Sequence, residues 1–390
     1  MNRRPRSKGN AAGPATAGHD LSGAAPFLWP GLALAEAGHV IGALTRGFGG
    51  LVPTGSPREP WSWTTPNVAG LELRTMRLRD FSTSPRGPAV LVCAPFSLHQ
   101  ASIADLAHGH SLIAALRAGG LDRLFLTEWL SATPEMRFLG IDDYLADLNV
   151  AIDDLGGRVD LVGICQGGWM SLLYAARFPA KVRSLVLAGS PIDLSTDSSV
   201  SSLAKSVPLS AFASAVQLGG GRILGAYALE FWSGSHMSAG VARNALQLDA
   251  SDRSASARAT ISRLRDWNTR TVDLPGAYYL EVVERLFHDN QLAAGRFVAL
   301  GKTVDLGTVA APTFLLAASD DEIVPPAQLL DAERLLGTPK RQIRHAVVEG
   351  SHLSLFMGAR TLRTAWPHIA TWLRSQRSAR AGGRRRSVRT

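Results

Sequence analysis

The sequence has few cysteines and no cysteine motif that would hold a metal. Only Cys93 and Cys165 occur among the 390 residues, and they lie far apart along the chain. This excludes a disulfide framework and a thiolate zinc site, and we expect neither a metal nor a cofactor. A free thiol nucleophile is best kept in a reducing compartment, so we predict a cytoplasmic location.

A long uninterrupted apolar run is also missing, although 46% of the residues are hydrophobic. The apolar stretch that starts at Ala25 is interrupted by Pro30, Glu36 and Arg46, so we predict neither a transmembrane segment nor a secretion signal. Residues 29–51 are expected to form an amphipathic helix and a Gly-rich loop. Two interpretations of this helix stay open: packing on its own domain, and docking of a partner or a hydrophobic particle.

Unbalanced charge is confined to the two ends of the chain. The net charge is +9, but residues 1–24 hold four basic side chains against one acidic, and residues 374–390 hold seven arginines and no acid. Both ends have too few apolar residues to fold. We therefore predict a disordered basic tail over 1–24, a folded domain over 25–373, and a disordered Arg-rich tail over 374–390. Nucleic-acid contact by the basic tail is compatible with this charge but is not the main function that we expect.

Short apolar runs alternate with amphipathic helical stretches within the folded domain. This alternation predicts an α/β fold with a mostly parallel, doubly wound sheet covered by helices on both faces. The predicted strands are Leu71–Leu78, Ala89–Cys93, Arg123–Thr127, Val159–Ile164, Ser184–Ala188, Thr313–Ala317 and Arg344–Val348. The predicted helices are His110–Ala118, Ile141–Leu155, Gln166–Phe178, Ala327–Leu336 and Thr361–Leu373. Residues of about 194–300 break the rhythm and predict a helical cap over the active site, with a helical subdomain that has no substrate role as the alternative.

The segment Gly163-Ile164-Cys165-Gln166-Gly167-Gly168 lies between an apolar strand and a helix-like stretch. This is the setting of a nucleophile elbow, with cysteine as the nucleophile; a phosphate-binding turn is the alternative for such a glycine-rich segment. Gly163 and Gly167 lie two residues before and two residues after Cys165. They agree with a nucleophile elbow, because side chains at these positions would collide with neighbouring backbone. Gln166 is predicted to aim its N–H at a developing oxyanion. Phe96 is predicted to be the second donor of this oxyanion hole, because Pro95 before it has no N–H.

A thiol nucleophile needs a base and a group that orients the base. In such a chain the acid and then the histidine follow the nucleophile. Asp320 and Asp321 both follow an apolar strand, and either can supply the carboxylate; we favour Asp321 and expect the other to be a turn residue. His352 follows the last strand, where the base belongs. The predicted catalytic residues are thus Cys165, Asp321 and His352.

Cysteine in place of serine favours acyl transfer over simple hydrolysis. A thiolate that attacks an acyl-CoA exchanges one thioester for another, so the acyl group stays activated. Such an intermediate suits the passing of an acyl group to an alcohol.

Several segments together resemble the polyhydroxyalkanoate synthase and intracellular polyhydroxyalkanoate depolymerase superfamily. These are Glu128-Trp129, Ile141-Asp142-Asp143-Tyr144, the cysteine segment 163–168, Gly189-Ser190-Pro191-Ile192-Asp193, Asn290-Gln291-Leu292, Asp321-Glu322-Ile323-Val324-Pro325-Pro326 and Gly350-Ser351-His352. The likeness runs from about Pro88 to Leu373. It implies an α/β-hydrolase fold in which Cys165, Asp321 and His352 form a triad, in agreement with the assignment from the residues.

Three functions stay open. The first is a synthase-like acyltransferase that forms thioester intermediates from (R)-3-hydroxyacyl-CoA, which is a substrate and not a cofactor. The second is an intracellular depolymerase, or a related hydroxyacyl (thio)ester hydrolase, with the same triad. The third is a non-catalytic protein that binds storage granules.

The branch of the superfamily also stays open at this point. The two glycines after Gln166 resemble the synthases, particularly the small subunits that work with a second protein. Ser97, His99 and the segment 274–280 resemble the depolymerases. Expected partners are therefore the hydroxyacyl-CoA or the polymer, the surface of a storage granule, and a second synthase subunit.

Overall fold

The structure is a computed structural model that describes residues 59–232 and 237–387. The predicted basic tail 1–24 and the predicted helix within 29–51 lie outside these residues. Within the described residues, no helix combines the length and the apolar character needed to cross a bilayer.

Eight strands form the central sheet, in the order β1-β2-β6-β3-β7-β8-β13-β14. Their bounds are Val68–Glu72 (β1), Met76–Asp80 (β2), Val90–Cys93 (β3), Leu124–Trp129 (β6), Val159–Ile164 (β7), Val182–Ala188 (β8), Thr313–Ala318 (β13) and Ile343–Val348 (β14). The six strands from β6 to β14 run parallel, and β1 and β2 are antiparallel at one edge. The predicted mostly parallel sheet is confirmed. Every residue of β3, β7 and β13 is buried, which explains why these strands are mostly apolar.

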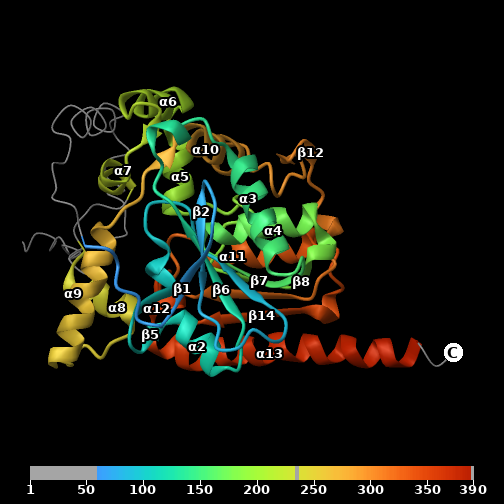
Figure 1. Cartoon of the computed structure of the whole chain (residues 1–390). Helices are drawn as coiled ribbons and strands as arrows, with labels where there is room; N and C mark the ends of the chain where they lie inside the picture. Colours follow the sequence, from blue (N-terminus) through green and yellow to red (C-terminus); the bar gives the residue numbers. More distant parts are fainter. Residues whose placement is uncertain (1–58, 233–236, 388–390) are drawn as a thin grey trace, which may run out of the picture.

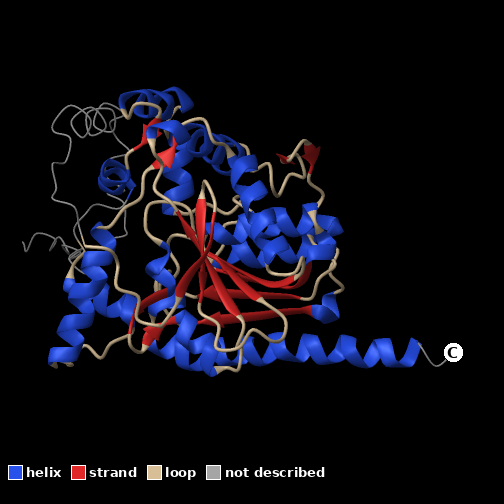
Figure 2. Cartoon of the chain, in the orientation of Figure 1, coloured by secondary structure: helices blue, strands red, loops and turns tan. Residues whose placement is uncertain are grey.

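Helices cover both faces of the sheet. Figure 1 shows α3 (Ile141–Asp154) and α4 (Gln166–Arg177) on one face, and α2 (Leu112–Ala118) and α13 (Ala359–Ser387) on the other; Figure 2 shows the same layers by element type. On α3 the buried side chains recur at the three- and four-residue spacing of one helical face.

Shorter elements lie between these strands and helices. They are β4 (Asp105–Ala107), β5 (His110–Ser111), α11 (Pro326–Leu330), α12 (Ser354–Met357), β11 (Val298–Ala299), β12 (Lys302–Thr303) and a π-helix (Val282–His288), with 3-10 turns at Ala101–Ala104, Pro134–Met136, Pro179–Lys181, Leu306–Thr308, Asp331–Leu335 and Lys340–Gln342.

The first predicted strand, 71–78, is wrong as a single element. It is a hairpin of β1 and β2, closed by a hydrogen bond of 2.8 Å from the N–H of Leu73 to the carbonyl of Met76. Asp147 on α3 fixes the turn, since its Oδ2 accepts from the N–H and the hydroxyl of Thr75 at 3.1 and 2.7 Å. The turn contains neither glycine nor proline, so no local signal divides the two strands.

The last helix is longer than predicted. The structure places residues 374–387 in α13, in place of the start of a disordered tail. Arg377 ties this stretch to the sheet: its Nε and Nη2 lie 3.0 Å from Oδ2 of Asp160, a fully buried carboxylate in β7. Arginine and alanine are also good helix formers. A buried partner more than two hundred residues away is not visible in the composition of the tail.

A long helical insertion separates β8 from β13. Its helices α5 (Ser199–Ser206), α6 (Leu209–Leu218), α7 (Gly225–Trp232) and α10 (Gly276–Glu281) gather beyond one end of the sheet, whereas α8 (Ala239–Leu246) and α9 (Ala255–Thr269) lie to one side (Figure 1). A short antiparallel ladder pairs β9 (Arg222–Ile223), which precedes α7, with β10 (Leu274–Pro275), which precedes α10. These elements occupy the region predicted as a cap.

Two of the resembling segments join the ends of this insertion. Asn290 donates from Nδ2 to Oδ1 of Asp193 at 2.9 Å, and its own Oδ1 accepts from the N–H of Leu194 at 3.1 Å. The pairing joins the start of the insertion to a residue near its end, almost a hundred residues further along the chain.

Candidate active site

Cys165 sits in a sharp turn between β7 and α4. Its backbone has φ 49° and ψ −125°, in the strained left-handed half of the map that non-glycine residues rarely occupy. The flanking glycines leave no room for a side chain. A Cβ on Gly163 would lie 2.5 Å from Cα of Gly168, and one on Gly167 would lie 2.1 Å from the carbonyl oxygen of Cys93. The strain is therefore held by close backbone packing on both sides of the thiol.

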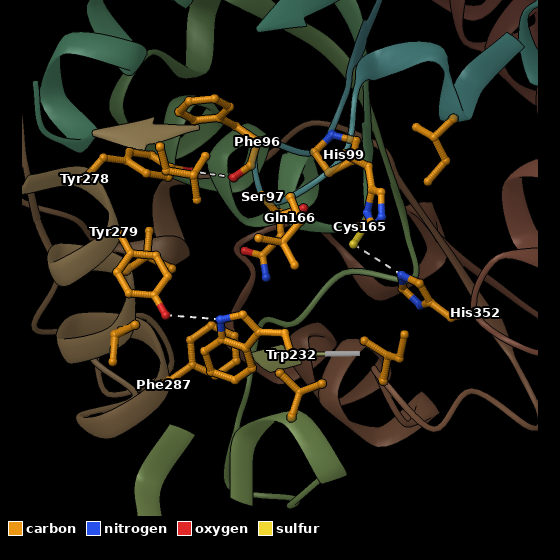
Figure 3. A pocket seen from close by; sticks show the side chains of 18 of the residues that line it. Phe96, Ser97, His99, Cys165, Gln166, Trp232, Tyr278, Tyr279, Phe287 and His352 are labelled. Atoms are coloured by element: carbon orange, nitrogen blue, oxygen red, sulfur yellow. Dashed lines mark hydrogen bonds between the residues drawn. The ribbon is translucent and has the colours of Figure 1, made fainter. Parts of the chain in front are cut away.

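The structure brings the three predicted residues together. Nε2 of His352 lies 3.2 Å from Sγ of Cys165, and Nδ1 lies 2.7 Å from Oδ2 of Asp321 (Figure 3 shows the first contact). The side chains of His352 and Asp321 are 4% and 0% exposed. Because a carboxylate only accepts, the proton on Nδ1 points at Asp321 and leaves Nε2 to exchange a proton with the sulfur.

The geometry distinguishes the two adjacent aspartates. Asp321 is oriented by the backbone N–H groups of Ile323 and Val324, which donate to Oδ1 at 3.0 and 2.8 Å. Asp320 is exposed and accepts from the hydroxyl of Ser319 at 3.1 Å. It is therefore Asp321 that reaches the imidazole.

The surroundings of His352 favour its protonated form. Burial lowers the pKa of this imidazole, but the Asp321 carboxylate and the Cys165 sulfur together outweigh burial and hold the pKa well above its usual value. Such a ring stabilises a thiolate beside it, which is the nucleophilic form of cysteine. Cys93 differs: it is fully buried in β3, and burial raises the pKa of its thiol to about 12.

Gln166 and Phe96, the two predicted oxyanion-hole residues, both line the pocket that contains Cys165. Among the described residues, neither Gln166 at the start of α4 nor Phe96 after β3 donates its N–H to an acceptor. Free N–H groups beside a nucleophile can hold the oxygen of a tetrahedral intermediate. The side chain of Gln166 is turned to Trp169, whose Nε1 donates to its Oε1 at 2.5 Å.

The loop that carries Phe96 is fixed by hydrogen bonds from two elements, β6 and α10. The N–H of Ala94 donates to Oγ1 of Thr127 at 2.9 Å, and Nε1 of Trp129 donates to the carbonyl of Ala94 at 2.8 Å. From the insertion, the hydroxyl of Tyr278 donates to the carbonyl of Phe96 at 3.2 Å (Figure 3). The loop is thus preorganised before any ligand binds.

An aromatic cluster beneath this loop unites segments that are distant in sequence. The ring of Phe96 lies 4.6 Å from that of Tyr144 on α3, 4.9 Å from that of Tyr278 on α10, and 6.0 Å from that of Trp129 on β6. Trp129 and Tyr144 belong to the segments on which the family resemblance depends. Their contacts give those segments a role in supporting the loop beside the nucleophile.

A pocket opens over Cys165, mostly between the sheet and the insertion. It holds about 1140 Å³ of space between atoms, part of it open to solvent. Apolar and aromatic side chains make up most of its wall: Pro95, Phe96, Leu98, Ile103, Val200, Trp232, Trp267, Leu274, Tyr278, Tyr279, Val282, Val283, Phe287, Ile323 and Leu353. Five polar or reactive side chains also line it, namely Ser97, His99, Cys165, Gln166 and His352. A chamber with so apolar a wall suits an acyl chain.

Sequence reasoning missed the residues that shape this pocket. His99 was named only for its likeness to the depolymerases and was given no place in the site, but it lies in the pocket wall. Tyr278 and Tyr279 come from the segment 274–280, whose likeness to the depolymerases was the available signal. Among the residues that the structure describes, no group of three or more His, Cys, Asp or Glu side chains is placed to hold a metal.

The chain belongs to the alpha/beta hydrolase fold family, whose profile matches residues 127–359. It is an enzyme of the acyltransferase or hydrolase kind. More particularly, it is similar to the poly(3-hydroxyalkanoate) polymerase subunit PhaC of Synechocystis sp., with 29% identity over 69% of this chain and 73% of that protein. The subunit PhaC of Allochromatium vinosum is 26% identical over 73% of this chain and 81% of its own. These matches confirm the resemblance seen in the segments.

Among solved structures, a thermophilic esterase from Thermogutta terrifontis covers 80% of this chain and 99% of its own, with 16% identity and a TM-score of 0.48.

Proposed function

We propose that this protein is a polyhydroxyalkanoate synthase-like acyltransferase that builds a polyester from (R)-3-hydroxyacyl-CoA through thioesters on Cys165. The observation that carries the proposal is the contact of 3.2 Å between Sγ of Cys165 and Nε2 of His352 at the floor of an apolar pocket. The similarity to the polymerase subunits PhaC supports it.

In the first half of the reaction, Cys165 takes the acyl group. The proton of the thiol already rests on Nε2 of His352, and the thiolate attacks the carbonyl carbon of the acyl-CoA thioester. The N–H groups of Gln166 and Phe96 stabilise the oxyanion that forms. The intermediate collapses with cleavage of the bond to the CoA sulfur, which takes the proton from His352 and leaves as CoA thiol. One thioester has replaced another.

In the second half, the hydroxyl of another hydroxyacyl group is the acceptor. Nε2 of His352 takes the hydroxyl proton while the oxygen attacks the acyl carbonyl on Cys165. Collapse of this intermediate forms the ester and releases the Cys165 thiolate, beside which the proton on His352 remains. Asp321 holds the ring in place and stabilises its positive charge in both halves.

The apolar wall of the pocket favours transfer to an alcohol over transfer to water. A chamber lined mostly by aliphatic and aromatic side chains gives water few partners, whereas an acyl chain gains by burying its methylene groups there. Cysteine adds to this preference, because the acyl-enzyme stays an activated thioester.

The proposal is tested with the purified full chain. With 3-hydroxybutyryl-CoA, we expect release of CoA thiol together with rising turbidity from polymer; with amorphous polymer granules, we expect little release of monomer. Monomer release without polymer formation would instead identify a hydrolase. Absence of both activities, with granule binding intact, would favour a non-catalytic granule protein.

Two cysteine variants show whether the nucleophile is assigned correctly. Cys165→Ala should abolish CoA release, because it removes the sulfur, and should leave the melting temperature within a few degrees of the wild type. Cys93→Ala is the matched control, since its thiol is sealed in β3 with a raised pKa; it should keep most of the activity. Loss of activity in the control alone would contradict the assignment.

A further inference from the structure

His99 lies in the loop between β3 and the 3-10 turn at Ala101–Ala104, in the wall of the pocket that holds Cys165 and His352 (Figure 3). Its ring stacks on Trp267 of α9, with centroids 4.4 Å apart and planes inclined by 22°. Its backbone forms a β-bridge with Thr271. Both the ring and the backbone of His99 are thus held by the insertion.

The hydrogen bond of His99 fixes its tautomer. Nε2 lies 3.1 Å from the backbone carbonyl oxygen of Asn268, and a carbonyl oxygen only accepts, so Nε2 carries the proton. Burial lowers the pKa of His99 to about 4, against a smaller raising effect of the hydrogen bonding with Asn268. The ring is therefore neutral near pH 7. A neutral ring that is protonated at Nε2 has a bare Nδ1, which is an acceptor.

The bond to Asn268 uses Nε2 and leaves Nδ1 unused. Among the described residues, Nδ1 of His99 has no hydrogen-bond partner. It is also not among the buried polar atoms that lack both a partner and contact with solvent. Most of the neighbouring wall is apolar and offers a ligand hydroxyl nothing to bond. A fixed acceptor in such a wall favours ligands that bring a donor, because a ligand without one leaves it unsatisfied.

We propose that Nδ1 of His99 accepts a hydrogen bond from the hydroxyl group of the hydroxyacyl substrate, and so selects hydroxyacyl thioesters over plain acyl thioesters. The inference rests on the proposed function and names a specificity-determining residue for it. A neutral acceptor suits a hydroxyl and repels a carboxylate, so dicarboxylic acyl groups are poor substrates by the same geometry.

The test compares two thioesters that differ by one hydroxyl, (R)-3-hydroxybutyryl-CoA and butyryl-CoA. The measured quantity is kcat/KM for the first release of CoA thiol, which requires acylation of Cys165 but no polymer. In the wild type the hydroxylated thioester should be preferred. In His99→Phe, which keeps a ring for Trp267 to stack on, the preference should fall by about tenfold, the value of one lost hydrogen bond.

Two further variants separate recognition from general damage. His99→Gln restores an acceptor and should recover part of the preference. His108→Phe makes the same change at an exposed turn between β4 and β5 and should leave the preference as in the wild type. An unchanged preference in His99→Phe, or an equal loss with both thioesters, would overturn the inference. If the wild type released CoA from butyryl-CoA alone, the proposed function itself would fail.

A measurement without any change at His99 covers the case in which His99→Phe does not fold. Cys165→Ala protein labelled with ¹⁵N-histidine binds the thioesters without reacting. The resonance of the bare Nδ1 should move when (R)-3-hydroxybutyryl-CoA is added and stay in place with butyryl-CoA. Equal responses to the two ligands would refute the hydrogen bond.

Discussion

Asp321→Asn is the substitution that tests the triad most directly. In the native site, Oδ1 of Asp321 accepts from the N–H groups of Ile323 and Val324, and Oδ2 accepts from Nδ1 of His352. An asparagine keeps its carbonyl oxygen on the two N–H groups and turns its NH₂ toward the ring. Nδ1 must then accept, so the neutral ring carries its proton on Nε2. That tautomer cannot take the proton of Cys165.

The expected loss in kcat/KM is about 10³-fold. A hydrogen bond to a charged group contributes ~1.5–3 kcal/mol, which alone corresponds to about 10- to 100-fold. The wrong tautomer adds to this, and the same change in a serine triad costs about 10⁴. A thiol gives up its proton more easily than a serine hydroxyl, so the cost here should be smaller than in that case.

The assay is the first release of CoA thiol from (R)-3-hydroxybutyryl-CoA, with thermal unfolding recorded in parallel. Asp320→Asn is the matched control, because the neighbouring carboxylate is exposed and contacts Ser319. It should stay within twofold of the wild type. A loss of less than tenfold in Asp321→Asn, or an equal loss in the control, would refute the role given to Asp321.

Three further predictions concern the elbow, the last helix and pH. Gly167→Ala should lower the melting temperature by several degrees and abolish CoA release, because its Cβ would lie 2.1 Å from the carbonyl oxygen of Cys93. Arg377→Ala should lower the free energy of unfolding in urea by about 2–3 kcal/mol and leave kcat unchanged, because it strips one cation from the buried Asp160. The folded-state pKa of His352 lies well above 6.5, so its stabilising charge is complete below pH 6.5 and is lost as pH rises through the folded value. The rate of CoA release should therefore hold through pH 6.5 and decline only well above it. A decline centred at pH 6.5 would contradict this.

The sequence predicts those parts of the fold and the site that depend only on residues close together along the chain. The elbow is local, because strand, tight turn and helix follow within about twenty residues, and His352 follows its strand in the same way. The choice of Asp321 over Asp320 depends on which carboxylate faces the ring, and that is a matter of a turn's geometry. The position of Phe96 follows from the loop after β3, whereas its role as a donor stays a prediction.

Contacts between distant segments explain what the sequence could not predict. His99 enters the pocket wall because Trp267 and Asn268, about 170 residues further on, stack and bond to it. The helix over residues 374–387 is held in part by Arg377 on Asp160. In neither case does a periodic pattern or a turn signal mark the partner. Such pairings become visible only when the chain is folded.

The bond from Tyr278 to Phe96 has a practical consequence for chimeras. Exchanging the insertion between relatives is an obvious route to new acyl-chain preferences, yet this tyrosine steadies the loop beside the nucleophile from within the exchanged segment. A graft that brings a foreign residue to that position would alter turnover as well as chain-length preference. Donor segments should therefore be chosen for a phenol at this site before they are chosen for the width of their pocket.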